Sequence, residues 1–149
     1  MVILGLGSNI GDRNVHIDRA ISHLAEHIGP VVRSPIYESE ALLPEGATAE
    51  WNMPFLNLAI QGEWKRSACE LLKCIKQTEL SLGRQFRGRW APREIDIDIL
   101  SMDAVVVEEE GLSVPHRELL NRSFALVPLA DLVPDWRYPC PGEYYDWRA

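Results

Sequence analysis

The chain has 149 residues, a hydrophobic fraction of 46%, a charged fraction of 25% and a formal net charge of -7 at pH 7. This length favours a single domain, residues 1–149, that can bury its own core. The acidic balance argues against general binding to nucleic acid or to anionic membranes, because both need a basic surface.

Three cysteines, Cys69, Cys74 and Cys140, show neither metal-binding nor redox spacing. A sparse, odd set of this kind indicates reduced thiols and predicts a cytoplasmic location. The N-terminus reaches Gly5 and Gly7 too soon for a signal peptide. No apolar run approaches the roughly 20 residues of a membrane helix, so we expect no membrane association.

The first elements are a short apolar strand over residues 2–6 and a helix that Asp12 can cap. The glycine-rich residues 5–11 between them resemble a dinucleotide or P-loop motif only superficially. Ile10 stands where a glycine is needed, and no Gly-Lys-Ser/Thr follows. A tight turn from strand to helix is the better interpretation. The helix should end at Gly29.

A second strand is predicted over residues 31–37, followed by a long polar loop over residues 38–54. Loops of this length in compact domains are usually functional or disordered. Residues 55–64 alternate again and predict a third strand. Asn57 is a poor strand residue, and its carboxamide suits the edge of a planar polar ring. A polar strand residue satisfied within the protein explains Asn57 equally well.

Ser67 and Glu70 form a capping box that opens a second helix, and Gly83 is suited to end it. Glu79 falls on the apolar stripe of this helix. A carboxylate directed at the core needs a partner. The candidates are Arg84 and Arg87, just beyond the helix.

Residues 84–100 then combine four arginines with a strand in which Asp96 and Asp98 share one face. Their Cα atoms should lie roughly 6.6 Å apart, which favours a hard divalent cation between the carboxylates. Arginine forks match phosphate oxygens in pairs. The two features together indicate a metal–phosphate site. The alternative is a solvated acidic face that pairs with the arginines.

Residues 105–107 and 112–114 predict a small hairpin around an acidic turn. His116, Arg122 and Phe124 follow, and residues 125–132 predict a short helix. Alone, His116 is more often a surface histidine than a catalyst. The Pro- and Trp-rich tail from Pro134 is expected on the surface.

The order strand, helix, strand, strand, helix, strand predicts an α+β fold. It is the ferredoxin-like βαββαβ arrangement, an antiparallel sheet with helices on one face.

Residues 89–100, RWAPREIDIDIL, resemble the signature of the 6-hydroxymethyl-7,8-dihydropterin pyrophosphokinase family. The resemblance extends from Leu4 to about Trp136 and implies the same fold. It implies transfer of pyrophosphate from ATP to the hydroxymethyl group of a reduced pterin in folate biosynthesis, with AMP as the other product. ATP, the pterin and two Mg²⁺ ions are the implied ligands, and we expect a monomer.

The resemblance also implies roles for individual residues. Those implied in catalysis are Arg84, Arg93, Asp96 and Asp98, with both aspartates as metal ligands and Glu79 in support. Those implied in ATP binding are Arg87, Trp90, Arg93, His116 and Arg122. Those implied in pterin binding are Ser39, Leu42, Phe55, Asn57, Asp96 and Phe124.

Two other classes of protein fit parts of the pattern. A metal-dependent nuclease would use the acidic pair, but it predicts a basic surface that the net charge of -7 does not supply. A catalytically inactive ferredoxin-like module that binds nucleotide or pterin predicts loss of the acidic pair or the arginines. Both groups are present in the sequence.

Overall fold

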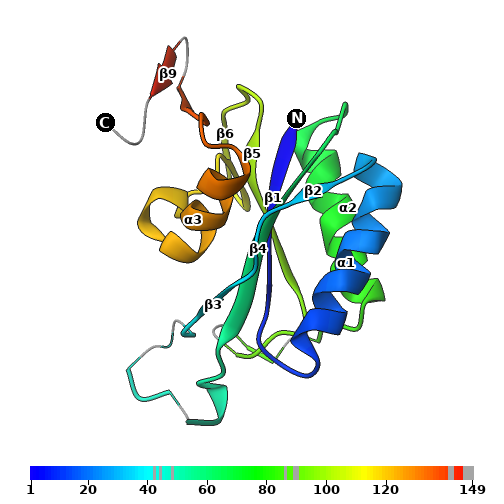
Figure 1. The fold of residues 1–149 in the computed structure, drawn as a ribbon, viewed down its shortest axis with the longest axis vertical. Helices are drawn as coiled ribbons and strands as arrows, with labels where there is room; N and C mark the ends of the chain where they lie inside the picture. Colours follow the sequence, from blue (N-terminus) through cyan, green and yellow to red (C-terminus); the bar gives the residue numbers. More distant parts are fainter. Residues whose placement is uncertain are drawn as a thin grey trace.

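The computed structural model of the chain describes residues 1–41, 43, 45–47, 49–85, 87–88, 91–140 and 143–145. Its centre is an antiparallel sheet with strands in the order β2-β4-β1-β5, and β3 also pairs with β4 (Figure 1). Along the chain, the elements up to the last strand of this sheet are β1 (Val2–Ser8), α1 (Arg13–Ile28), β2 (Val32–Arg33), β3 (Tyr37–Ser39), a 3-10 turn η1 (Ala49–Trp51), β4 (Phe55–Gly62), α2 (Ala68–Ser81) and β5 (Asp96–Met102). Beyond it lie β6 (Val107–Glu109), β7 (Leu112–Val114), a 3-10 turn η2 (Leu119–Asn121), α3 (Ser123–Leu132), β8 (Tyr138–Cys140) and β9 (Glu143–Tyr145).

This order confirms the predicted βαββαβ arrangement. The helices α1 and α2 lie side by side on one face of the sheet, as expected, whereas α3 lies on the other face (Figure 1). The physical reason is that both faces are apolar, so each needs a cover. None of the helices in the described residues is long and apolar enough to cross a membrane.

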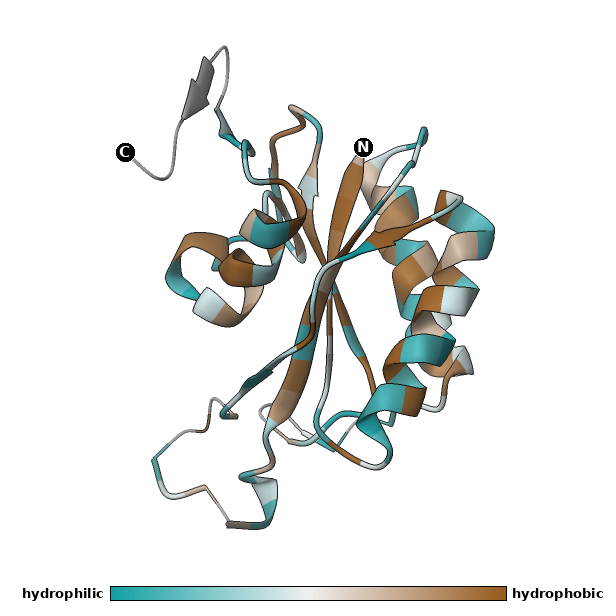
Figure 2. Ribbon diagram, viewed as in Figure 1, coloured by the Kyte–Doolittle hydropathy of each residue, from teal (hydrophilic) through white to brown (hydrophobic). Residues whose placement is uncertain are grey.

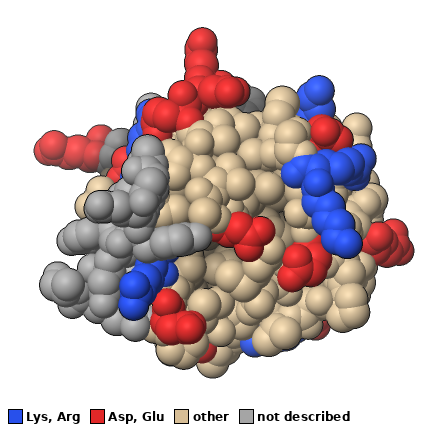
Figure 3. Space-filling model, turned by 90° about the horizontal axis from the view of Figure 1, so that it is seen from above, with Lys and Arg blue, Asp and Glu red and all other residues tan. Residues whose placement is uncertain are grey.

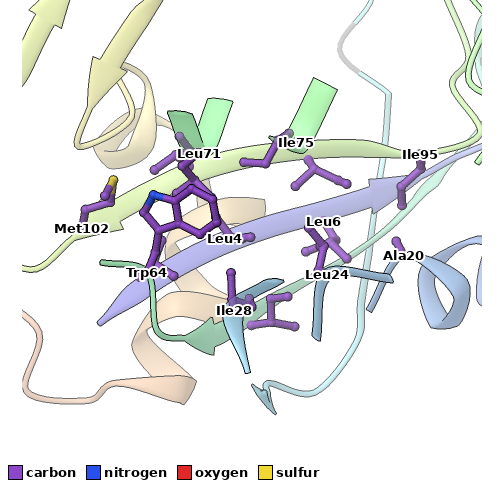
Figure 4. Packing of buried hydrophobic residues seen from close by; sticks show 14 of the residues in the cluster. Leu4, Leu6, Ala20, Leu24, Ile28, Trp64, Leu71, Ile75, Ile95 and Met102 are labelled. Atoms are coloured by element: carbon purple, nitrogen blue, oxygen red, sulfur yellow. The ribbon is translucent and has the colours of Figure 1, made fainter. Parts of the chain in front are cut away.

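The larger core lies between the sheet and the pair α1 and α2. Figure 4 shows Leu4 and Leu6 of β1 pointing toward Leu24 of α1 and Ile75 of α2. All four side chains are fully or almost fully buried. The helices carry hydrophobic residues on the faces turned to the sheet and hydrophilic residues outward (Figure 2), which is the pattern of amphipathic helices on a sheet.

A second core fills the space between the sheet and α3. It consists of Ile3, Ala59, Leu100, Leu119, Leu129 and Trp136. The prediction that the tail lies on the surface is wrong at Trp136, which is only 5% exposed and donates from Nε1 to Ser101 Oγ at 3.1 Å. An indole is largely apolar with a single donor, so one buried hydroxyl satisfies it.

The predicted second strand is divided into β2 and β3 around Ser34 and Pro35. Pro35 has no N–H to give to the ladder. Ser34 bridges the gap instead: its N–H donates to Ala59 O at 2.9 Å, and its Oγ accepts from Ala59 N at 2.9 Å. The edge of the sheet is therefore interrupted at Ser34 but remains attached to β4.

The predicted caps of α1 and α2 are confirmed, whereas α3 begins at Ser123, two residues before the predicted start. The Asp12 carboxylate accepts from Val15 N at 3.2 Å, and Ser67 Oγ accepts from Glu70 N at 3.1 Å. Gly83 follows α2 with a φ of +91°, a conformation that favours glycine. The hairpin also forms, but its first strand is residues 107–109 rather than 105–107.

Candidate active site

A cavity of about 240 Å³ opens on the α3 side of the sheet. Its floor is the backbone of Gly5 and Gly7 in β1. A Cβ at Gly7 would lie 3.2 Å from Asn57 Oδ1 and 3.3 Å from Phe55 Cδ1. The absence of a side chain at Gly7 therefore lets Asn57 and Phe55 pack close to the strand.

Part of the cavity lining combines aromatic rings with a carboxamide. Phe55, Asn57 and Phe124 all line it, as the sequence predicts, and so does Ser39. Asn57 is 6% exposed, and its Nδ2 donates to Ser39 Oγ at 2.7 Å. Among the described residues, Ser39 is the hydrogen-bond partner of the Asn57 side chain. Asn57 Oδ1 can therefore accept from an incoming ring.

The acidic pair lies across β1 from Asn57, since Asn57 and Asp96 are both in register with Gly7. Asp96 and Asp98 both line the cavity, because residues two apart in β5 point the same way. Asp96 lies between two arginines: Arg84 Nη1 is 3.3 Å from its Oδ1, and Arg93 Nη1 is 3.3 Å from its Oδ2. Arg93 and Arg122 also line the cavity. Asp96, Arg84 and Arg93 thus form one cluster, an arrangement common to the predicted metal–phosphate site and to its alternative, an acidic face paired with the arginines.

Glu79 lies behind this cluster with only 3% of its side chain exposed. Its Oε2 accepts from Arg84 Nη1 at 2.6 Å and from the backbone N–H of Ile97 at 2.9 Å. Of the two partners predicted for Glu79, the structure selects Arg84. Glu79 thus holds both an arginine of the cluster and the strand between the two aspartates.

Asp98 differs electrostatically from Asp96. Burial of its carboxyl, together with the negative charges of Asp96 and Glu79, raises the pKa of Asp98 to about 7. Its side chain nevertheless keeps 46% of its surface exposed, so water reaches the group from the cavity side. A carboxyl of this kind is poised to exchange a proton for a cation near neutral pH.

A second cavity, of about 340 Å³, adjoins the first at Asp98, which lines both. Lys76, His116 and Arg117 contribute basic groups to it. Glu118 N donates to His116 Nδ1 at 3.2 Å, which places the imidazole proton on Nε2, 3.8 Å from Asp98 Oδ1. Burial and the charge of Arg122 lower the pKa of His116. A neutral imidazole therefore presents an N–H donor to this cavity.

Not every predicted residue reaches a cavity. Arg87 is exposed and pairs with Glu94, donating from Nη1 to Oε2 at 2.8 Å. This ion pair lowers the pKa of Glu94. Leu42 and Trp90, predicted to contact pterin and ATP, lie outside the described residues.

The sequence-based interpretation missed Lys76 and Arg117. Lys76 precedes Glu79 by three residues and so shares its helix face. Arg117 follows His116 directly. Both positions could have been found from their spacing to residues already chosen.

Among the described residues, no group of three or more His, Cys, Asp or Glu side chains could hold a metal ion. The acidic pair therefore offers two carboxylates. That donor set fits Mg²⁺, which proteins usually bind through one or two carboxylates while substrate phosphates and water complete the shell. It does not suit a structural zinc site, which needs four protein ligands.

Comparison with known proteins places this geometry in context. Residues 3–134 match the family described as 7,8-dihydro-6-hydroxymethylpterin-pyrophosphokinase (HPPK). A 2-amino-4-hydroxy-6-hydroxymethyldihydropteridine pyrophosphokinase of Methylorubrum extorquens is 42% identical over 135 residues, covering 89% of this chain and 82% of that protein. These matches confirm the resemblance predicted from the signature.

Longer proteins are also similar. A folate synthesis bifunctional protein of Chlamydia trachomatis serovar D is 39% identical over 144 residues, covering 95% of this chain but 32% of that protein. The chain thus spans about a third of the length of such relatives. A solved wild-type HPPK-DHPS of Plasmodium falciparum shares the fold, with a TM-score of 0.64 at 17% identity over 99% of this chain and 43% of that one.

Proposed function

Because this chain belongs to the 7,8-dihydro-6-hydroxymethylpterin-pyrophosphokinase family, we propose that it transfers pyrophosphate from ATP to 6-hydroxymethyl-7,8-dihydropterin. The acceptor is the hydroxymethyl group, the other product is AMP, and the reaction belongs to folate biosynthesis. The observation that carries the proposal is the cavity at Asp96. It brings two aromatic rings and a carboxamide next to a cluster of two carboxylates and three arginines.

The pterin fits the first cavity. Phe55 and Phe124 can stack on the two faces of its ring, while Asn57 and Ser39 supply donors and acceptors to its edge. The glycine floor lets the ring approach the backbone of β1. This placement directs the hydroxymethyl group toward Asp96 and Asp98.

The nucleotide fits the second cavity, with its phosphates toward Asp98. Arg93 and Arg122, which line the first cavity, and Arg84, which pairs with Asp96, can then bind phosphate oxygens, and the Nε2–H of His116 adds a neutral donor. We infer that catalysis rests on positioning and on stabilising negative charge, as in other phosphoryl transfers. Trp90 and Arg87 are proposed to bind ATP as well.

We propose that Asp96 and Asp98 hold two Mg²⁺ ions together with ATP. When bound, these ions neutralise charge on the transferred group and on AMP, and they lower the pKa of the attacking hydroxyl. In their absence the two arginines hold the Asp96 carboxylate in place through ion pairs. The same side chains can turn from Asp96 to phosphate once a cation replaces them.

An inactive binding module is the alternative. It would need no acidic pair, yet the pair and its arginines converge on one cavity. The proximity of catalytic and stacking groups therefore favours an active enzyme over a binding module.

The proposed partners are ATP and a reduced pterin rather than nucleic acid. On the face shown in Figure 3, basic side chains form small separate groups with acidic ones beside them. We further propose that residues 1–149 form one domain and act as a monomer, since one chain supplies the described groups that line both cavities. The free thiols Cys69 and Cys74 suit the cytoplasm.

The first test is calorimetric titration with 6-hydroxymethylpterin, with and without Mg²⁺ and a non-hydrolysable ATP analogue. We expect the affinity for pterin to rise by about tenfold or more when the nucleotide is present. The reason is that the nucleotide orders the side chains at the junction of the two cavities before pterin binds. Asn57→Ala should weaken pterin binding by about tenfold or more, because it removes the polar edge contact. Asn121→Ala, at an exposed position, is the matched control. Absence of pterin binding under both conditions would contradict the substrate assignment.

The raised pKa of Asp98 predicts a pH dependence of cation binding. The neutral carboxyl cannot ligate a cation, so Mn²⁺ affinity should rise from pH 6 to pH 8, by up to about tenfold per unit below the pKa of about 7. The metal-free protein should show the opposite trend in stability. In the folded protein the pKa of Asp98 lies above its ordinary value of 3.8. The stabilisation that comes from the protonated Asp98 carboxyl is therefore fully present below pH 3.8 and is lost as the pH rises through about 7. Mn²⁺ titrations at pH 6, 7 and 8 measure the change in affinity, and Asp98→Asn should flatten this pH dependence. An unchanged profile in that variant would assign the proton to another group.

A further inference from the structure

Asn9 belongs to the glycine-rich turn after β1 and has no role in the proposed chemistry. It lies at the end of β1, two residues beyond the cavity floor at Gly7, and is only 1% exposed. A buried carboxamide needs partners for both its oxygen and its nitrogen. Asn9 finds them in two different loops.

The first contact is with the loop that carries the arginines. Asn9 N donates to Arg93 O at 3.1 Å, and Arg93 N donates to Asn9 Oδ1 at 2.8 Å. This two-point contact fixes the backbone of Arg93. The Arg93 guanidinium in turn reaches Asp96 and lines the cavity. Asn9 therefore sets the position of the phosphate-binding wall.

The second contact is with the loop that precedes β4. Asn9 Nδ2 donates to Met53 O at 3.0 Å. Met53 lies two residues before Phe55, the aromatic residue that begins β4 and lines the cavity. The same side chain therefore also anchors the wall proposed to stack on pterin.

We propose that Asn9 is a positioning residue that couples two loops, one that lines the cavity at Arg93 and one that leads into the cavity residue Phe55. Ordering of the Arg93 segment (residues 91–93) by a nucleotide is transmitted through the Asn9 side chain to the Met53 segment (residues 49–53). The nucleotide half of this inference rests on the proposed function. The coupling itself is a property of the free protein.

The chemistry of the side chain makes the coupling testable. Coupling needs one group that accepts from Arg93 N and donates to Met53 O at the same time. An aspartate keeps the first bond but cannot make the second, because an ionised carboxylate only accepts. Asn9→Asp therefore separates the two side-chain bonds, whereas Asn9→Ala removes both and keeps only the backbone bond from residue 9 to Arg93 O. Asn14→Ala, at an exposed position in the first turn of α1, is the matched control.

Hydrogen exchange of the whole chain is the measurement. Useful reporters are amides that do not bond to Asn9: Met53 N, which donates to Trp51 O, and Ala91 N, which donates to Gly88 O. In the free protein, Asn9→Ala should speed exchange in both segments. Asn9→Asp should speed it in the Met53 segment alone, by about threefold to tenfold, the ratio that one hydrogen bond represents.

A second comparison adds Mg²⁺ and a non-hydrolysable ATP analogue. In the wild type, the nucleotide should slow exchange in both segments. In Asn9→Asp it should still slow exchange in the Arg93 segment but leave the Met53 segment unchanged. A residue with a merely structural role would lower stability without breaking this transmission.

The inference is overturned if Asn9→Asp speeds exchange in both segments or in neither, or if the nucleotide still protects the Met53 segment of that variant. A wild type that does not respond to the nucleotide would count against the proposed nucleotide site instead. The comparison of the free variants would then decide whether Asn9 couples the loops.

Discussion

Asp96→Asn is expected to lower kcat by about a hundredfold to a thousandfold, the usual effect of removing one preorganised group that stabilises transition-state charge. Asp96 lies on the acidic wall, and both of its oxygens face arginines. An amide cannot replace the carboxylate as a cation ligand of equal strength. Affinity for pterin should change by less than about tenfold, because Asn57 and the aromatic rings remain.

Steady-state kinetics and calorimetry of the same variant measure the two quantities. Asp18→Asn is the control, because Asp18 is an exposed carboxylate that pairs with Arg33 on the surface. Its loss should alter neither kcat nor pterin affinity. Equal losses of turnover and pterin binding in Asp96→Asn would contradict the metal-ligand role of Asp96.

Glu79→Leu is expected to destabilise the fold by about 3–5 kcal/mol, the range measured when one partner of a buried ion pair is removed. Glu79 is almost completely buried, and Arg84 is 21% exposed. Leucine leaves the Arg84 guanidinium without its closest carboxylate. It also leaves the N–H of Ile97 without the acceptor it now uses.

Urea unfolding at constant pH measures this loss. Glu79→Gln should cost less, because its amide oxygen can still accept from Ile97 N, and the difference between the two variants reports the orphaned N–H. Glu26→Gln, at an exposed position of α1, is the control and should change stability by less than about 0.5 kcal/mol. A fully stable Glu79→Leu protein would show that Glu79 does not hold β5.

The sequence alone predicted features that depend on neighbours along the chain. Helix caps at Asp12 and Ser67 follow from side chains that bond within the same turn. The shared face of Asp96 and Asp98 follows from the period of a strand. The buried carboxylate of Glu79 follows from helix periodicity, and its need for a cation narrowed the partner to two arginines.

The tertiary structure decided what depends on partners distant in sequence. Trp136 enters a core because α3 leaves room beside Ser101, which no local pattern reveals. Asp98 acquires a raised pKa because the fold partly desolvates its carboxyl and brings it near the charges of Asp96 and Glu79. Asn9 binds Met53 and Arg93, 44 and 84 residues away. Periodicity specifies the face on which a side chain lies, whereas only the packed sheet determines which other side chains it meets there.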